Sequence, residues 1–121
     1  THVEFLDNLP QTKIIELLKK AKLLIHTSQF ETFGLVAVEA NAMGVPVLTT
    51  NKGSLMEIIE NNNNGYLTEN LLAGNVNSFV KNLLNENKTF EEISLSCVNM
   101  SKKYDWLKTA NELQSLYEDL I

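Results

Sequence analysis

Short apolar runs mark the strands that the sequence predicts. Residues 45–50 form a β-branched run and residues 23–26 a shorter aliphatic one, and such continuous runs are typical of strands buried in a parallel sheet. Residues 2–6 alternate between polar and apolar side chains instead, and residues 65–68 follow a strong Asn-Gly turn signal. The pattern therefore predicts four short strands.

Helical periodicity fills the segments between and after these strands. Apolar residues recur at spacings of three and four within 14–21, 35–43, 55–59, 76–84 and 93–104, and again after Asp105. Alternating strands and helices predict an α/β fold, with a Rossmann-like parallel sheet of about four strands flanked by helices, in one domain spanning residues 1–121. Ligands of such sheets bind beyond the carboxyl ends of the strands, where the loops 26–34 and 51–54 fall.

The first predicted strand raises a question of topology. In the usual doubly wound order, residues 2–6 would be separated in space from residues 23–26 by two strands that this chain does not contain. Either the sheet closes in another order, or the chain is a piece of a larger fold.

A carboxylate interrupts the apolar helix predicted at residues 35–43. Glu39 and Asn41 are its polar residues, so we expect the helix to be buried on most sides. A buried carboxylate needs a donor, because burial without a partner costs several kcal/mol. A ligand with vicinal hydroxyls would meet this need, and so would a backbone amide or a distant lysine.

A second carboxylate, Glu31, lies eight positions earlier and has two interpretations. The spacing of Ser28 and Glu31 fits a capping box, in which each side chain satisfies the other residue's backbone amide. Alternatively, the helix begins only after Gly34, and the free N–H groups at its start favour an anion such as a diphosphate.

Composition narrows the classes of function. The net charge is −5, with no basic cluster, which disfavours nucleic acid and anionic membranes as partners. No segment resembles a membrane span or a signal peptide, so we expect a cytoplasmic location. One cysteine, together with two histidines far apart in the sequence, predicts no metal site. All ten basic residues are lysine.

One long motif carries a resemblance to a known family. The stretch Ser28-x-x-Glu31-x-Phe33-Gly34-Leu35-x-x-x-Glu39-Ala40-x-x-x-Gly44-x-Pro46-Val47 resembles the Glu-x7-Glu motif of group 1 (GT4) retaining glycosyltransferases. These enzymes have the GT-B fold. Further matching segments are Val3-x-Phe5, Glu57-Ile58-Ile59, Asn64-Gly65-x-Leu67 and Trp106. The resemblance covers almost the whole chain and is to the C-terminal, donor-binding domain of the family.

The resemblance implies a role for each matching residue. Glu39 would bind the ribose hydroxyls of a nucleotide-diphosphate sugar, and Glu31 would be the catalytic-site carboxylate that contacts the donor sugar. The remaining donor-binding residues would be Ser28, Phe33, Gly34 and Leu35.

The resemblance also implies a reaction and its requirements. The enzyme would transfer the sugar with retention of configuration to a glycan, lipid or small-molecule acceptor, without a cofactor or an obligatory metal. Its acceptor-binding N-terminal domain and the family's upstream Arg and Lys pair are absent from this sequence. We therefore expect the chain alone to be inactive. Membrane association of the parent enzyme is compatible with the family but is not indicated by these residues.

Other classes of protein remain open from the sequence. The motif would also suit a non-catalytic module that binds nucleotides or sugar phosphates. A flavodoxin-like signalling domain is a third interpretation, although it requires a cluster of carboxylates at the strand ends, which only Glu31 approaches.

Overall fold

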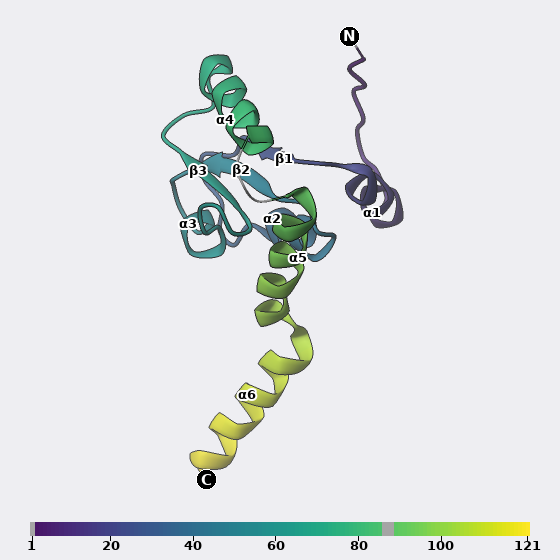
Figure 1. Ribbon diagram of the computed structural model, residues 1–121. Coiled ribbons are helices and arrows are strands. Elements are labelled where there is room, and N and C mark those ends of the chain that lie inside the picture. Colours follow the sequence, from purple (N-terminus) through teal and green to yellow (C-terminus); the bar gives the residue numbers. More distant parts are fainter. Residues whose placement is uncertain (1, 86–88) are drawn as a thin grey trace.

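Three parallel strands form the centre of the structure, a computed structural model that describes residues 2–85 and 89–121 (Figure 1). They are β1 (Leu24–His26), β2 (Val47–Thr50) and β3 (Gly65–Thr68), and they lie in the order β1-β2-β3. Val47 pairs with Leu24 on one side and with Gly65 on the other. The parallel pairing confirms the predicted α/β class.

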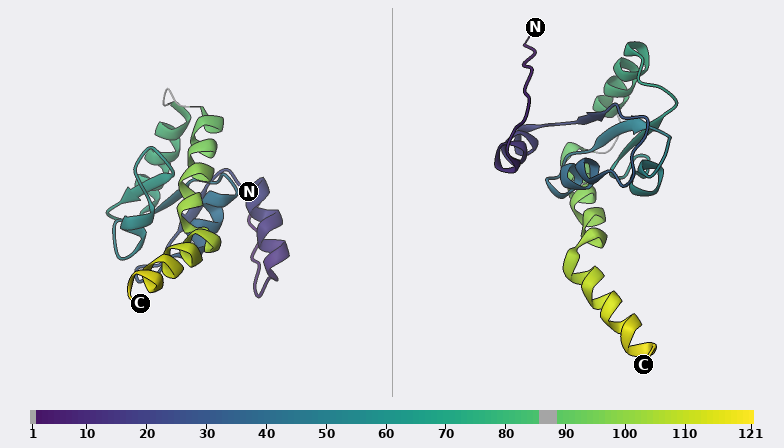
Figure 2. Two further views of the ribbon diagram at one scale, coloured as in Figure 1. Left: turned by 90° about the horizontal axis from the view of Figure 1, so that it is seen from below. Right: turned by 180° about the vertical axis from the view of Figure 1, so that it is seen from behind.

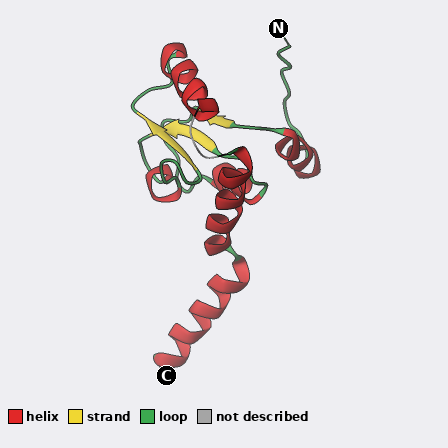
Figure 3. Ribbon diagram, viewed as in Figure 1, coloured by secondary structure: helices red, strands yellow, loops and turns green. Residues whose placement is uncertain are grey.

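Helices connect and follow these strands. They are α1 (Gln11–Lys20), α2 (Leu35–Ala42), α3 (Leu55–Ile58), α4 (Ala73–Asn85), α5 (Phe90–Ser101), the 3-10 helix η1 (Lys102–Tyr104) and α6 (Trp106–Asp119). Helix α4 lies on one side of the sheet, and α2 and α5 lie together on the other side (Figures 1 and 3). The sheet is therefore covered on both faces, as expected for parallel strands.

The fourth predicted strand, at residues 2–6, is wrong. This segment has no strand partner, its Phe5 side chain is 95% exposed, and it extends away from the sheet (Figure 1). A strand requires a neighbour for its backbone hydrogen bonds, and alternation along the sequence cannot supply one. Among the described residues the sheet has three strands rather than about four.

The main core lies where α1, α2 and α3 meet the sheet. Its buried side chains are Leu18, Ala37, Ala40, Val45, Val47, Leu55, Ile58 and Ile59. Helix α2 ends where the sequence predicted, because Gly44 adopts a left-handed φ of 76° and Pro46 follows. These contacts fix α2, and therefore Glu39, relative to the ends of β1 and β2.

Helix α6 extends away from the rest of the molecule (Figures 1 and 2). Asp105 caps it as predicted, since its carboxylate accepts from the Leu107 N–H at 2.8 Å. No residue of this helix is buried, and Trp106 at its start is 84% exposed.

Candidate functional site

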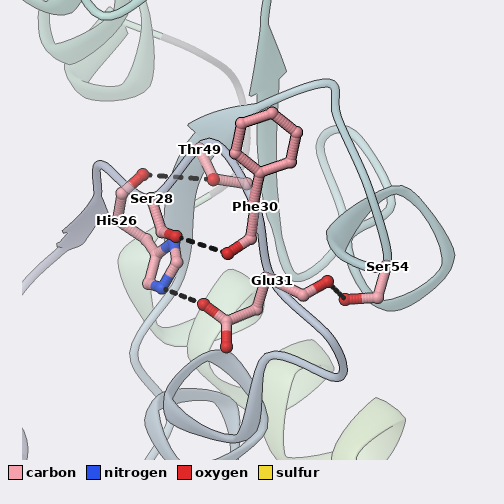
Figure 4. Close-up of polar contacts among 6 residues, drawn as sticks. All are labelled: His26, Ser28, Phe30, Glu31, Thr49 and Ser54. Atoms are coloured by element: carbon pink, nitrogen blue, oxygen red, sulfur yellow. Dashed lines mark hydrogen bonds and ion pairs between the residues drawn. The ribbon is translucent and has the colours of Figure 1, made fainter.

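The loop from β1 to α2 lies at the carboxyl end of the sheet. Helix α2 begins at Leu35, after Gly34, so the capping-box interpretation of Ser28 and Glu31 is wrong. The Ser28 hydroxyl donates instead to the Phe30 carbonyl at 2.9 Å, which closes a local turn (Figure 4). The alternative start after Gly34 is confirmed.

Gly34 has both an unusual conformation and a close neighbour. Its φ is +85°, and a Cβ at this position would lie 2.6 Å from Leu55 Cδ2. Glycine adopts this conformation without steric cost. It allows the chain to turn tightly from the loop into α2, so that the backbone N–H groups of Leu35 and Val36 start the helix without intrahelical acceptors.

Glu31 precedes this helix start and contacts two other segments (Figure 4). Its Oε2 lies 3.3 Å from His26 Nε2 at the end of β1, with 29% of the Glu31 side chain exposed. Its backbone carbonyl accepts from the Ser54 hydroxyl at 3.1 Å. The structure therefore brings together the two loops that the sequence placed at this edge of the sheet.

Glu39 lies one turn inside α2, on a side that is more open than predicted. Ala37, Ala40 and Asn41 are buried, but the Leu35 side chain is 60% exposed and Glu39 is partly exposed. The prediction of a helix buried on most sides is therefore wrong, because α5 and the sheet cover one side of α2 only.

The hydrogen-bond partner of Glu39 comes from α1. Gln11 Nε2 donates to Glu39 Oε1 at 3.1 Å. Within the described residues neither a lysine nor a backbone amide contacts this carboxylate, so the alternative of a structural partner of that kind is not observed. Such a contact leaves acceptor sites on the carboxylate for further donors.

A groove of about 610 Å³ runs along the open side of α2. It is lined by Phe33, Leu35, Val38, Glu39, Lys103, Tyr104, Trp106 and Thr109. The Phe33 and Tyr104 rings meet edge to face, with centroids 5.8 Å apart. Three of the predicted donor-binding residues, Phe33, Leu35 and Glu39, therefore share one groove with the cation Lys103.

The sequence did not predict Gln11, Lys103 or Tyr104 as neighbours of this site. Gln11 precedes Glu39 by 28 positions, and no local pattern links the two. His26 was recognisable as the last residue of a predicted strand, a position where ligand-binding residues gather, but nothing in the sequence paired it with Glu31.

Two further observations concern the described part of the chain. It contains no group of three or more His, Cys, Asp or Glu side chains that could hold a metal ion. None of the helices described is long and apolar enough to cross a membrane.

A comparison with protein families decides the family of this chain. The family model described as "Glycosyl transferases group 1" matches residues 1–96, which include all of the elements that form the loop and the groove except η1 and α6. The chain belongs to this family.

Similar curated proteins are glycosyltransferases of greater length. An uncharacterised glycosyltransferase of Methanocaldococcus jannaschii is 29% identical over 99% of this chain and 34% of its own length. A D-inositol 3-phosphate glycosyltransferase of Corynebacterium glutamicum is 29% identical over 98% of this chain and 28% of its own length. This group 1 glycosyltransferase chain therefore spans about a third of the length of these relatives.

Solved structures show the same fold. Anabaena HepE in complex with UDP-glucose matches with a TM-score of 0.72 and 25% identity, over 89% of this chain and 30% of HepE. The C-terminal domain of LpcC, a group 1 glycosyl transferase of Francisella tularensis, matches with a TM-score of 0.69 and 26% identity, over 86% of this chain and 53% of that one. The Rossmann-like fold of a group 1 glycosyltransferase is thereby confirmed.

Proposed function

We propose that this chain is the donor-binding part of a retaining glycosyltransferase, which transfers a sugar from a nucleotide-diphosphate sugar. One arrangement carries the proposal. Along the chain, the open N–H groups at the start of α2 come between two glutamates, Glu31 before the helix and Glu39 one turn inside it. A donor presents the same order of groups, with a diphosphate between two components that carry hydroxyls.

The start of α2 suits the diphosphate. Backbone N–H groups and the positive end of the helix dipole favour anions, and the positive φ of Gly34 places this helix start directly after the loop that carries Glu31. Lys103 adds a positive charge to the adjoining groove. In the transition state, charge would build on the leaving diphosphate and be stabilised by these donors. We propose that this stabilisation requires no metal ion.

The two carboxylates suit the two hydroxyl-bearing ends of the donor. Glu39 accepts one hydrogen bond from Gln11 and retains acceptor sites for the vicinal hydroxyls of a ribose. Glu31 is held by its backbone and by His26 beside the helix start, where it would contact hydroxyls of the transferred sugar. Anabaena HepE, a structural neighbour at 25% identity, has been solved with UDP-glucose, which supports this class of ligand.

In this proposal, sugar transfer requires a second, acceptor-binding domain. We propose that the acceptor binds to a separate N-terminal domain and that the 121-residue chain alone binds donor without transferring its sugar. NMR of the product made by a two-domain enzyme would test retention. The same anomeric configuration in product and donor supports retention, and the opposite configuration contradicts it.

Isothermal titration calorimetry of the chain tests donor binding. UDP, GDP and ADP would each be titrated into wild type and Glu39→Ala, with Glu16→Ala as a control that removes the same charge from an exposed ion pair. We expect one nucleotide to bind preferentially and Glu39→Ala to weaken it about tenfold, as expected for a lost charged hydrogen bond. Binding of none of the three, or equal binding in Glu39→Ala, would contradict the proposal.

A further inference from the structure

We infer that His26 is a positioning residue that holds Glu31 in the orientation required for the donor sugar. The inference rests on the proposed function, because Glu31 is assigned to the sugar there. It adds a residue outside the motif that carries the family resemblance, and it starts from the contact of His26 Nε2 with Glu31 Oε2 at 3.3 Å (Figure 4).

Both the backbone and the side chain of His26 are held in place by neighbouring residues. It is the last residue of β1 and pairs with Thr49 of β2, whose hydroxyl donates to the His26 carbonyl at 3.1 Å. Only 11% of the imidazole-bearing side chain is exposed. The ring therefore has little freedom, and a residue that is hydrogen-bonded into the sheet is a more rigid support than the loop that carries Glu31.

The surroundings of the ring favour one arrangement of its proton. Nδ1 is buried and has no hydrogen-bond partner among the described residues. A buried N–H without an acceptor is costly, so a neutral ring with its proton on Nε2 fits the site, since that nitrogen faces the carboxylate. In this tautomer the Nε2–H can pair with the Glu31 carboxylate, whose Oε2 lies 3.3 Å away, and Nδ1 needs no acceptor.

The contact of His26 with Glu31 determines which oxygen of the Glu31 carboxylate remains available to accept hydrogen bonds from the sugar. Glu31 Oε2 faces His26, while no described residue donates to Oε1. Loss of the imidazole donor would leave the partly exposed Glu31 side chain free to change rotamer. The consequence would fall on contacts with the sugar and not on the diphosphate, which is bound by the backbone of α2, or on the ribose, which is bound by Glu39.

Two variants separate this role from a general structural one. His26→Leu removes the donor while keeping a side chain that fills space, and His26→Gln retains an amide N–H that can reach the position of Nε2. For each chain, the best-binding nucleoside diphosphate and its glucose and mannose conjugates would be titrated by calorimetry. The ratio of the dissociation constant of the nucleotide to that of its sugar conjugate measures how much the sugar contributes to binding affinity.

We expect His26→Leu to reduce the contribution of the sugar roughly threefold to tenfold, as for one lost hydrogen bond, with nucleotide affinity unchanged and with recovery in His26→Gln. Nucleotide binding with an unchanged sugar contribution in His26→Leu would overturn the role of His26 alone. Binding of no nucleotide by any chain would overturn both the proposed function and this inference.

Long-range ¹H–¹⁵N NMR of the imidazole provides a readout that needs no ligand. We expect His26 to show the Nε2–H tautomer in the wild-type chain and its ring signals to shift in Glu31→Gln. A ring protonated on Nδ1 alone would overturn the inference whatever the chain binds.

Discussion

The side chains of Asn41 and Asn64 form a buried amide pair that joins α2 to the turn before β3. Asn64 Nδ2 donates to Asn41 Oδ1 at 2.7 Å, and the two side chains are 1% and 2% exposed. Asn41 Nδ2 also donates to the Val45 carbonyl, and Asn64 Oδ1 accepts from the Glu60 N–H. The pair thereby satisfies the Val45 carbonyl and the Glu60 N–H, and it links the helix that carries Glu39 to the turn before β3.

Replacing Asn64 with alanine should destabilise the fold strongly. The substitution leaves the Glu60 N–H and the Asn41 carboxamide without their partners, and each buried polar group left unsatisfied costs about 1–3 kcal/mol. We expect the free energy of unfolding in urea to fall by about 2–4 kcal/mol. Asn77→Ala, at an exposed position of α4, serves as the control and should be neutral or slightly stabilising. Equal effects of both changes would contradict the role of the pair.

Replacing Gly34 or Gly74 with alanine should change the free energy of unfolding in opposite directions. A Cβ at Gly34 would combine a positive φ with a 2.6 Å approach to Leu55, whereas a Cβ at Gly74 in α4 meets nothing within 4 Å. We expect Gly34→Ala to lower the free energy of unfolding by about 1–3 kcal/mol and to weaken nucleotide binding. Gly74→Ala should raise stability by about 0.5–1 kcal/mol and leave binding unchanged. Chemical denaturation and calorimetry of both variants test the pair of predictions, and a neutral Gly34→Ala would contradict them.

Cys97 should be protected from thiol reagents while the chain is folded. The residue is fully buried, and burial raises the pKa of its thiol from the ordinary 9.0 to about 12. Because the thiolate is the reactive form, alkylation by iodoacetamide at pH 8 should be at least on the order of 100-fold slower in buffer than in concentrated urea. Rapid labelling of the folded chain would show that α5 opens locally or that the thiol is accessible.

The raised pKa of the Cys97 thiol should also lower the free energy of unfolding at alkaline pH. Above pH 9 the unfolded chain releases the Cys97 proton while the folded chain keeps it up to pH about 12, so the unfolded state binds fewer protons and is favoured as the pH rises. The contribution of Cys97 to the free energy of unfolding should fall by up to about 1.4 kcal/mol per pH unit in this range. Urea unfolding of wild type and Cys97→Ala at pH 8 and pH 10 isolates it, because the other titrating groups are common to both chains. A constant difference between the two chains would contradict the prediction.

The sequence predicted the central part of the fold because its signals are local. The continuous apolar runs predicted β1 and β2, of which β2 is buried throughout, and the Asn-Gly turn signal predicted β3. Gly34 and Gly44 mark the start and the end of α2 through their positive φ. The alternating segment 2–6 failed because a strand also depends on a neighbour, which periodicity does not report.

The candidate site was predictable only in part. The positions of Glu31 and Glu39 around the helix start followed from the motif, but their partners His26 and Gln11 come from β1 and α1 and depend on the tertiary packing. The exposure of Leu35 was also not predictable, because an apolar residue on a helix does not reveal whether another element covers it.

A thermodynamic cycle between Glu39 and the 2′-hydroxyl of the nucleotide tests the central claim most directly. Calorimetry would give the affinities of wild type and Glu39→Ala for the preferred nucleoside diphosphate and for its 2′-deoxy form. If Glu39 binds the ribose, removing the hydroxyl should cost wild type about fivefold to tenfold in affinity and cost Glu39→Ala almost nothing. An equal loss in both chains would show that Glu39 does not contact the ribose and would contradict the account of the donor site.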